Sequence, residues 1–240
     1  MTLAYDGTQY HGFQKQGSGL KTIQETLEQA LFVLTQETIT VHGSGRTDAG
    51  VHAQGQVISF QSEIRVPAQR LPLAINSVLP RDIRVLECVD VEPDFHARFT
   101  AKRKTYCYKL YNERHMSPFW RYYAYHIPVP LDLGKMQQGA DYFRGTHDFS
   151  GFCAKDTKVR NFVRTIYDCE IDNEGPIVSF RITGNGFLWN MVRIMMGTLL
   201  TIGKGKRLPQ DIPKLLAAGE RQSVGATVPP HGLYLVSVEY

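Results

Sequence analysis

The order of strand-like and helix-like patterns restricts the fold of this 240-residue chain more than any other feature. Apolar residues that alternate with polar ones indicate strands, and apolar residues that recur every three to four positions indicate helices. In the first half, strands are expected at residues 2–5, 39–41, 56–60 and 83–89, and helices at residues 23–34 and 67–78. The first helix starts with a capping box, in which Thr22 caps the helix and Glu25 follows three residues later. The elements of this half therefore follow the order β-α-β-β-α-β.

A comparable order follows in the second half. Strands are expected at residues 104–111, 162–171, 177–183 and 233–240, and helices at residues 132–143 and 188–200. We therefore predict an α+β fold with two β-α-β-β-α-β-like halves, whose mainly antiparallel sheets are joined around a central active-site cleft. Residues 1–98 are expected to form the N-terminal half with a catalytic loop, and residues 99–240 the C-terminal half that completes the active site. No sequence repeat relates the halves, so their symmetry is inferred from the order of elements alone.

The composition excludes several classes of protein. With 42% hydrophobic and 21% charged residues, the chain has the make-up of an ordinary globular protein and not of a disordered one. No stretch approaches the roughly 18–20 apolar residues that a membrane span needs, and the first residues do not resemble a signal peptide. The four cysteines form no Cys-x-x-Cys pair, so neither a zinc site nor a disulfide framework is expected. These features favour a protein of the reducing cytoplasm.

Positive charge is concentrated locally, although the net charge is only +4. Three basic groups occur, at residues 102–104, 155–164 and 204–207. Each group, taken alone, is typical of a solvated surface. Several such groups in a chain that also carries neighbouring tyrosines indicate RNA binding as a second interpretation.

A glycine-rich loop between two expected strands carries the clearest candidate for chemistry. Residues 43–53 contain three glycines around a single carboxylate, Asp48, and a nearby cation, Arg46. Glycines allow sharp turns and close approach of another molecule, and loops supported by strands often hold functional groups. Asp48 could cap a turn with its own backbone, bind a metal with His42 and His52, or act as a nucleophile that a neighbouring cation keeps ionised. The loop lacks the second carboxylate of glycosidases and the nucleophile-elbow pattern of hydrolases.

Three residues elsewhere are further candidates. Arg193 lies in an apolar segment that is expected to form a buried helix, where losing the partner of a charge costs about 3–5 kcal/mol. It therefore needs a carboxylate, either a local one such as Glu170 or a distant one such as Asp48. Tyr106 lies on an alternating strand beside basic residues, where it either fills the core or stacks on an RNA base. Leu233 is expected as a core residue at the start of the last strand.

Seven short motifs, spread over almost the whole chain, form a specific combination. They are YDGTQYHGFQ at residues 5–14, GRTDAGVHA at 45–53, FHARF at 95–99, KTYCY at 104–108, THDF at 146–149, NMVR at 190–193 and PPHGLY at 229–234. In content and order they resemble the TruA family of tRNA pseudouridine synthases. The start departs from the family, whose members usually have several residues before the position of Thr2.

The resemblance implies isomerisation of uridine to pseudouridine at nucleotides 38, 39 and 40 in the anticodon stem-loop of tRNA. It also implies a homodimer that binds tRNA on a basic surface and needs no metal or organic cofactor. By position in the motifs, Asp48 matches the catalytic aspartate of the family, and Tyr106, Arg193 and Leu233 match its active-site tyrosine, arginine and leucine. Arg46 matches a substrate-binding arginine associated with displacement of the target nucleotide.

These matches imply a role for each residue. Asp48 is expected to attack the target uridine as a nucleophile, with Arg193 as its ion-pair partner. Tyr106 is expected to stack on the uracil and to assist proton transfer. His52 is expected to help bind the displaced strand, and Leu233 to close the pocket against water.

Overall fold

The first part of the chain follows the predicted order β-α-β-β-α-β. The computed structural model describes residues 1–17, 19–63, 66–154 and 159–240. The elements of this part are β1 (Thr2–Tyr5), α1 (Ile23–Thr35), β2 (His42–Gly43), β3 (His52–Ser59), α2 (Leu71–Val78) and β4 (Ile83–Glu87). The predicted cap of α1 is confirmed, because the side chain of Thr22 accepts a hydrogen bond from the backbone N–H of Glu25.

One predicted strand of this part is wrong. Residues 39–41 are not in a strand, and the paired strand β2 follows them. Ile39 and Val41 are buried on either side of the exposed Thr40, which is the burial pattern of a strand. The backbone N–H of Val41, however, donates to the carboxylate of Glu28 on α1 at 3.2 Å. A helix side chain therefore takes the place of a neighbouring strand.

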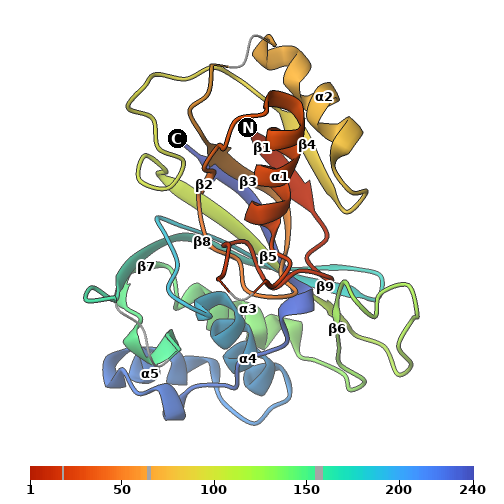
Figure 1. The fold of residues 1–240 in the computed structure, drawn as a ribbon. Helices are drawn as coiled ribbons and strands as arrows, with labels where there is room; N and C mark the ends of the chain where they lie inside the picture. Colours follow the sequence, from red (N-terminus) through yellow and green to blue (C-terminus); the bar gives the residue numbers. More distant parts are fainter. Residues whose placement is uncertain (18, 64–65, 155–158) are drawn as a thin grey trace. The chain divides into compact units, whose positions relative to one another are not determined.

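Residues 1–102 and 234–240 form one compact unit, here called unit 1. Its strands follow the order β4-β1-β3-β10, where β10 is the last strand of the chain (Leu233–Glu239) (Figure 1). β1 pairs antiparallel with β3 and with β4, whereas β10 pairs parallel with β3 through Tyr234 opposite His52. This pairing explains why β3 begins before the expected residue 56.

Two helices pack against each other in unit 1 (Figure 1). α1 buries one stripe of apolar residues, namely Ile23, Leu27, Ala30 and Leu31. The helical spacing of the sequence predicted these four residues and also Leu34, which is wrong because Leu34 is 37% exposed. The buried stripe faces the core of the unit.

Residues 103–233 form a second compact unit, here called unit 2. Its elements are β5 (Arg103–Tyr111), β6 (Tyr125–His126), α3 (Leu133–Asp141), β7 (Gly145–Asp148), β8 (Val163–Glu174), β9 (Ile177–Gly184), α4 (Met191–Gly203) and α5 (Ile212–Ala218). β5, β9, β8 and β7 are neighbours in that order and pair antiparallel, while β6 pairs parallel with β5. α3 packs against both α4 and β8. Lys155 and Lys158 of the expected basic group lie outside the described residues.

Short 3-10 helices occur in both units. They are η1 (Ala68–Arg70), η2 (Ser150–Phe152), η3 (Pro209–Asp211), η4 (Arg221–Ser223) and η5 (Pro230–Gly232). β6, β7 and α5 were not expected, because elements of two, four and seven residues are too short to show a clear period.

One predicted helix boundary in unit 2 is wrong. The helix expected at residues 188–200 begins at Met191, because Asn190 has a left-handed backbone (φ 60°) that a helix cannot contain. Trp189 therefore lies outside α4 and is 48% exposed. The helical spacing of the sequence predicted that Trp189 and Arg193 share one stripe of this helix, and that prediction is wrong. The prediction that the helix itself is buried is confirmed.

One predicted turn is also displaced. The sequence places a turn at residues 172–175, but β8 continues to Glu174 and pairs with β9 up to that residue. The side chains at the end of β8 are exposed and polar, so they look like a turn in the sequence while their backbones remain in the ladder.

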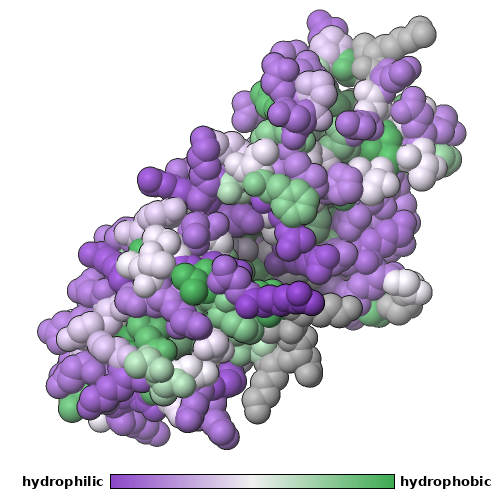
Figure 2. Space-filling model, turned by 90° about the vertical axis from the view of Figure 1, so that its left-hand side faces the viewer, coloured by the Kyte–Doolittle hydropathy of each residue, from purple (hydrophilic) through white to green (hydrophobic). Residues whose placement is uncertain are grey.

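The structure is an α+β fold with mainly antiparallel, mixed sheet pairing. The predicted halves, 1–98 and 99–240, differ from the compact units chiefly because residues 234–240 belong to unit 1. None of the helices in the described part of the chain has the length and apolar character of a membrane span. Figure 2 shows one face of the molecule as largely hydrophilic, with apolar residues scattered over it.

The close contact at Gly197 on α4 gives a stability prediction. A Cβ added to Gly197 would lie 1.9 Å from the backbone oxygen of Ala226. Gly197→Ala should therefore lower the free energy of unfolding, measured by urea denaturation, by about 1–3 kcal/mol. The control is Gly134→Ala on α3, where the nearest atom lies at 3.6 Å. It should raise that free energy by about 0.5–1 kcal/mol, and equal stability of the two variants would contradict the packing argument.

Candidate active site

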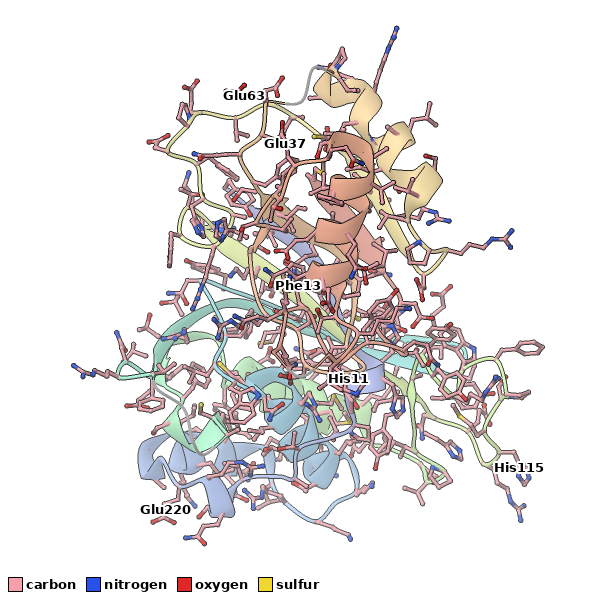
Figure 3. The ribbon with its side chains drawn as sticks, viewed as in Figure 1. His11, Phe13, Glu37, Glu63, His115 and Glu220 are labelled. Atoms are coloured by element: carbon pink, nitrogen blue, oxygen red, sulfur yellow. The ribbon has the colours of Figure 1, made fainter. Side chains whose placement is uncertain are left out.

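The backbone of the Asp48 loop is held directly against another segment of unit 1. The N–H of Phe13 donates to the carbonyl of Thr47 at 3.0 Å, and the N–H of Gly50 donates to the carbonyl of Tyr10 at 3.3 Å. These two bonds flank Asp48 in sequence. Figure 3 labels Phe13 near the N-terminal end of α1, where its carbonyl accepts from the backbone of α1. The first turn of α1 is thus bonded to the segment around Phe13, and that segment is bonded to the Asp48 loop.

Gly12 makes this close contact possible. Its backbone is left-handed, with φ +85°, a conformation that costs other residues free energy. A Cβ at this position would also lie 2.6 Å from the carbonyl oxygen of Thr47 and 3.2 Å from the carbonyl carbon of Asp48. Any side chain there would displace the backbone that carries Asp48.

Buried hydrogen bonds fix the loop from the sheet side. The hydroxyl of Tyr5 on β1 and the hydroxyl of Thr47 lie 2.8 Å apart. Burial raises the pKa of Tyr5, so its hydroxyl stays neutral at physiological pH. Gln56 of β3 accepts from the Ser44 hydroxyl at 2.5 Å and donates to the Gly45 carbonyl at 2.9 Å. The loop is therefore bonded at both ends and at its centre.

The charged residues of the loop differ in exposure. Asp48 is partly buried, and Arg46 is exposed. His52, at the end of the loop, is only 2% exposed. Its Nδ1 accepts from the backbone N–H of Gly7 at 3.1 Å, and its ring stacks on Tyr234 with centroids 4.8 Å apart. In this structure His52 supports the loop from inside unit 1.

Tyr106 lies in unit 2 on β5. It is 8% exposed, and its ring meets the ring of Phe187 edge-on at 5.1 Å between centroids. Tyr108 and Leu110, which share its face, are also buried as predicted. The predicted half-burial is wrong in the middle of the strand, because Thr105 and Cys107 on the other face are buried as well. The contact with Phe187 fixes the plane of the Tyr106 ring.

Arg193, on the first turn of α4, is held at two points of its guanidinium group. Its Nε donates to the carbonyl of Val228 at 2.8 Å, and its Nη1 donates to the side-chain oxygen of Asn190 at 2.6 Å. Two hydrogen bonds from different nitrogens hold the planar guanidinium group in one orientation. The geometry of its N–H groups suits a carboxylate, which can accept two hydrogen bonds from them.

The segment from Val228 to Leu233 is bonded to both elements of unit 2 that carry candidate site residues. Val228 accepts from Arg193, and the carbonyl of Pro229 accepts from the hydroxyl of Tyr108 at 2.7 Å. Leu233 follows and is 7% exposed. The helix that carries Arg193 and the strand that carries the predicted tyrosine are therefore both bonded to the segment that leads into Leu233.

Several supporting residues escaped the sequence analysis. They are Tyr5, Gly12, Gln56, Asn190, Phe187 and Val228. Tyr5, Gly12 and Asn190 lie in the short motifs, but no supporting role was inferred for them. Asn tolerates the left-handed backbone better than most residues, and Gly12 lies in a segment that was expected to be irregular.

The two sets of residues offer complementary chemistry. Unit 1 holds a carboxylate on a rigid loop, and unit 2 holds an oriented guanidinium, an aromatic ring and a buried leucine. Within the described ranges, no group of three or more His, Cys, Asp and Glu side chains could hold a metal ion. The four cysteines are buried and unbridged.

Comparisons with known proteins point to one family. The chain matches the family model described as tRNA pseudouridine synthase over residues 1–100 and 140–240. It is 49% identical to the tRNA pseudouridine synthase A of Moorella thermoacetica, over 100% of this chain and 98% of that protein. It is also 49% identical to that of Bacillus licheniformis, over 100% of this chain and 97% of that protein. A solved Cbf5-Nop10-Gar1 complex is similar at a TM-score of 0.35 and 11% identity, over 84% of this chain and 54% of that chain, a level that supports no functional conclusion.

The buried hydroxyl pair beneath the loop gives a second stability prediction. Tyr5→Phe leaves the Thr47 hydroxyl buried without its partner, so the free energy of unfolding should fall by about 1–3 kcal/mol in urea denaturation. The double variant Tyr5→Phe/Thr47→Val removes both hydroxyls and should recover most of that loss. Losses that simply add in the double variant would show that the two groups do not interact.

Proposed function

The chain belongs to the tRNA pseudouridine synthase family and is an isomerase, and on this premise we propose that it acts on nucleotides 38, 39 and 40 of the anticodon stem-loop. Asp48 is the nucleophile of this proposal. The observation that carries it is the anchoring of the Asp48 backbone by the bonds at Thr47 and Gly50, together with the partial exposure of the residue. A fixed carboxylate that solvent reaches is suited to attack on a bound base.

The reaction rearranges bonds without net oxidation. The bond between N1 and C1′ of the uridine breaks, and a bond between C5 and C1′ forms. The proton lost from C5 is balanced by the proton gained at N1. The carboxylate of Asp48 assists by covalent attack at C1′ or at C6 of the base, and both routes leave the enzyme unchanged at the end. No metal or organic cofactor takes part in this proposal.

The target uridine must leave the base stack before it reaches a protein carboxylate, which costs a few kcal/mol. We assign Arg46, which is exposed on the loop, to the displaced nucleotide or its neighbours. Tyr106 stacks on the flipped uracil and assists removal of the C5 proton. Arg193 pairs with Asp48 and keeps it ionised, and Leu233 closes the pocket against water.

His52 receives a different role from the one expected. Because it is 2% exposed and bonded to Gly7, it is assigned to the support of the loop and not to contact with RNA. The protein is further proposed to act as a homodimer in the cytoplasm. Sedimentation of the purified protein tests the dimer directly.

Asp48→Asn tests the nucleophile. The amide cannot form the covalent intermediate, so pseudouridine formation should fall by at least about a thousand-fold while tRNA binding persists. The measurement is tritium release from tRNA labelled at uridine C5, followed by mapping of the modified nucleotides. The exposed Asp90→Asn serves as a control and should keep full activity. Turnover by Asp48→Asn would exclude the nucleophile role, and loss of binding would point to RNA contact as the main role of Asp48.

Arg193→Lys tests the oriented guanidinium. Lysine keeps the charge but cannot reproduce the bonds to Val228 and Asn190 while facing a carboxylate. The single-turnover rate should fall by about ten- to a hundred-fold, with little change in the dissociation constant for tRNA. The exposed Arg181→Lys is the matched control on β9. Equal rates for Arg193→Lys and the parent would remove Arg193 from the catalytic set.

A further inference from the structure

A loop of unit 2 has the chemistry of an RNA-binding surface. Residues 112–124 connect β5 to β6, and together with the two residues of β6 they are here called the 112–126 loop. The loop lies between the two segments that match the family model, residues 1–100 and 140–240. The family model therefore does not cover the loop, although the similar relatives align over the whole chain.

Hydrogen bonds close the base of the loop. The side-chain amide of Asn112 donates to the carbonyls of Ile127 and Val129, both at 2.8 Å. At the other end of the loop, Nε2 of His126 lies 2.8 Å from the carbonyl oxygen of Glu113. A loop that is bonded across its base presents its outer residues without a large loss of entropy on binding.

Turns within the loop hold its aromatic residues in place. The N–H of Trp120 donates to the carbonyl of Ser117 at 3.1 Å, and the N–H of Ala124 donates to the carbonyl of Trp120 at 3.0 Å. Ala124 is fully buried, so this turn is packed onto the unit. Phe119 lies within the turn and is 84% exposed, more than any other large apolar side chain of the described residues.

Cations lie over the neighbouring aromatic rings. The guanidinium of Arg121 lies 4.5 Å from the ring centroid of Tyr122, and the ammonium of Lys109 lies 5.8 Å from that of Trp120. A cation over the face of an aromatic ring is attracted by the ring, so each pair keeps positive charge next to an aromatic surface. Figure 3 labels His115 on the same loop, where its side chain points outward.

The charge of the loop favours a polyanion over a protein partner. Residues 109–123 contain three Lys or Arg side chains and one acidic side chain, Glu113. Arg114 and Arg121 are exposed, and neither forms an ion pair with a carboxylate among the described residues. Exposed aromatic rings among unpaired cations are the arrangement by which proteins stack on unpaired bases and contact phosphates.

We propose that the 112–126 loop is a second contact surface for tRNA, which Phe119 and the arginines Arg114 and Arg121 bind. Phe119 stacks on a base that is unpaired in the tRNA, and the two arginines contact phosphates next to it. The proposal rests on the proposed function in that tRNA is taken as the substrate. It adds a surface of the chain that is separate in sequence from the candidate catalytic residues.

The test compares Phe119→Ala and Arg114→Gln with matched controls. The controls are Leu73→Ala, whose side chain is 81% exposed on α2, and Lys214→Gln, whose side chain is 82% exposed on α5. Dissociation constants for tRNA are measured by filter binding at several salt concentrations. The same series is repeated in the Asp48→Asn variant, so that turnover does not affect the binding measurement.

Phe119→Ala should weaken tRNA binding by about five- to a hundred-fold, the range expected for a lost stacking contact. Arg114→Gln should make the slope of log affinity against log salt less steep by about 0.7–0.9, the value for one phosphate contact. Both controls should bind as the parent does. Binding by Phe119→Ala within twofold of the parent would overturn the proposal. So would a change in sedimentation coefficient in Phe119→Ala, because the loop would then be an interface between two copies of the chain.

The outcome separates this proposal from the proposed function. If the parent forms pseudouridine but Phe119→Ala and Arg114→Gln bind tRNA normally, only the loop proposal fails. If the parent forms no pseudouridine but both variants still lose affinity, the loop proposal stands and the proposed function fails.

Discussion

The position of the candidate nucleophile depends on direct contact between two backbones, with no side chain between them. The segment that ends at Phe13 is bonded to the carbonyl of Thr47, and Gly12 leaves room for that contact. Beneath the loop, Tyr5 holds the Thr47 hydroxyl. Because these contacts surround Asp48 in sequence, the carboxylate has little freedom to move with its loop. Preorganisation of this kind is what a covalent mechanism requires, since misplacement of a reacting group by about 1 Å can cost about a hundred-fold in rate.

In unit 2, contacts with neighbouring residues orient the side chains of Arg193 and Tyr106. Arg193 is directed by a carbonyl of the 228–233 segment and by Asn190, a residue outside the helix that it precedes. The ring of Tyr106 packs edge-on against the ring of Phe187. The side chains of Arg193 and Tyr106 are thus oriented by neighbouring residues, and the fold of unit 2 positions those neighbours. In the proposed function, Asn190 therefore supports the guanidinium of Arg193 and has no assigned contact with the substrate.

Most of the architecture could be predicted from local patterns, and the failures have physical causes. The capped helix α1 and the strand at Tyr106 were recognised, because the residue types of each segment follow the helix or strand period. Burial on both faces of the strand at Thr105 and Cys107 was not foreseen. Residues 39–41 imitate a strand because they alternate in burial, yet the backbone N–H of Val41 is bonded to the Glu28 side chain and not to a neighbouring strand. The support of Asp48 could not be predicted, because Gly12 acts through a contact with residues far along the chain. The matched residues themselves were found by motif, and their roles remain proposals.

The central claim is that Asp48 and Arg193 act as one site on one uridine. A double-mutant cycle on the single-turnover rate of pseudouridine formation tests it most directly, with Asp48→Glu, Arg193→Lys and the combined variant. If the two residues act together, the combined variant should be about as slow as the slower single variant. If the two losses multiply in the combined variant, the residues act independently, and the account of a paired carboxylate and guanidinium is contradicted.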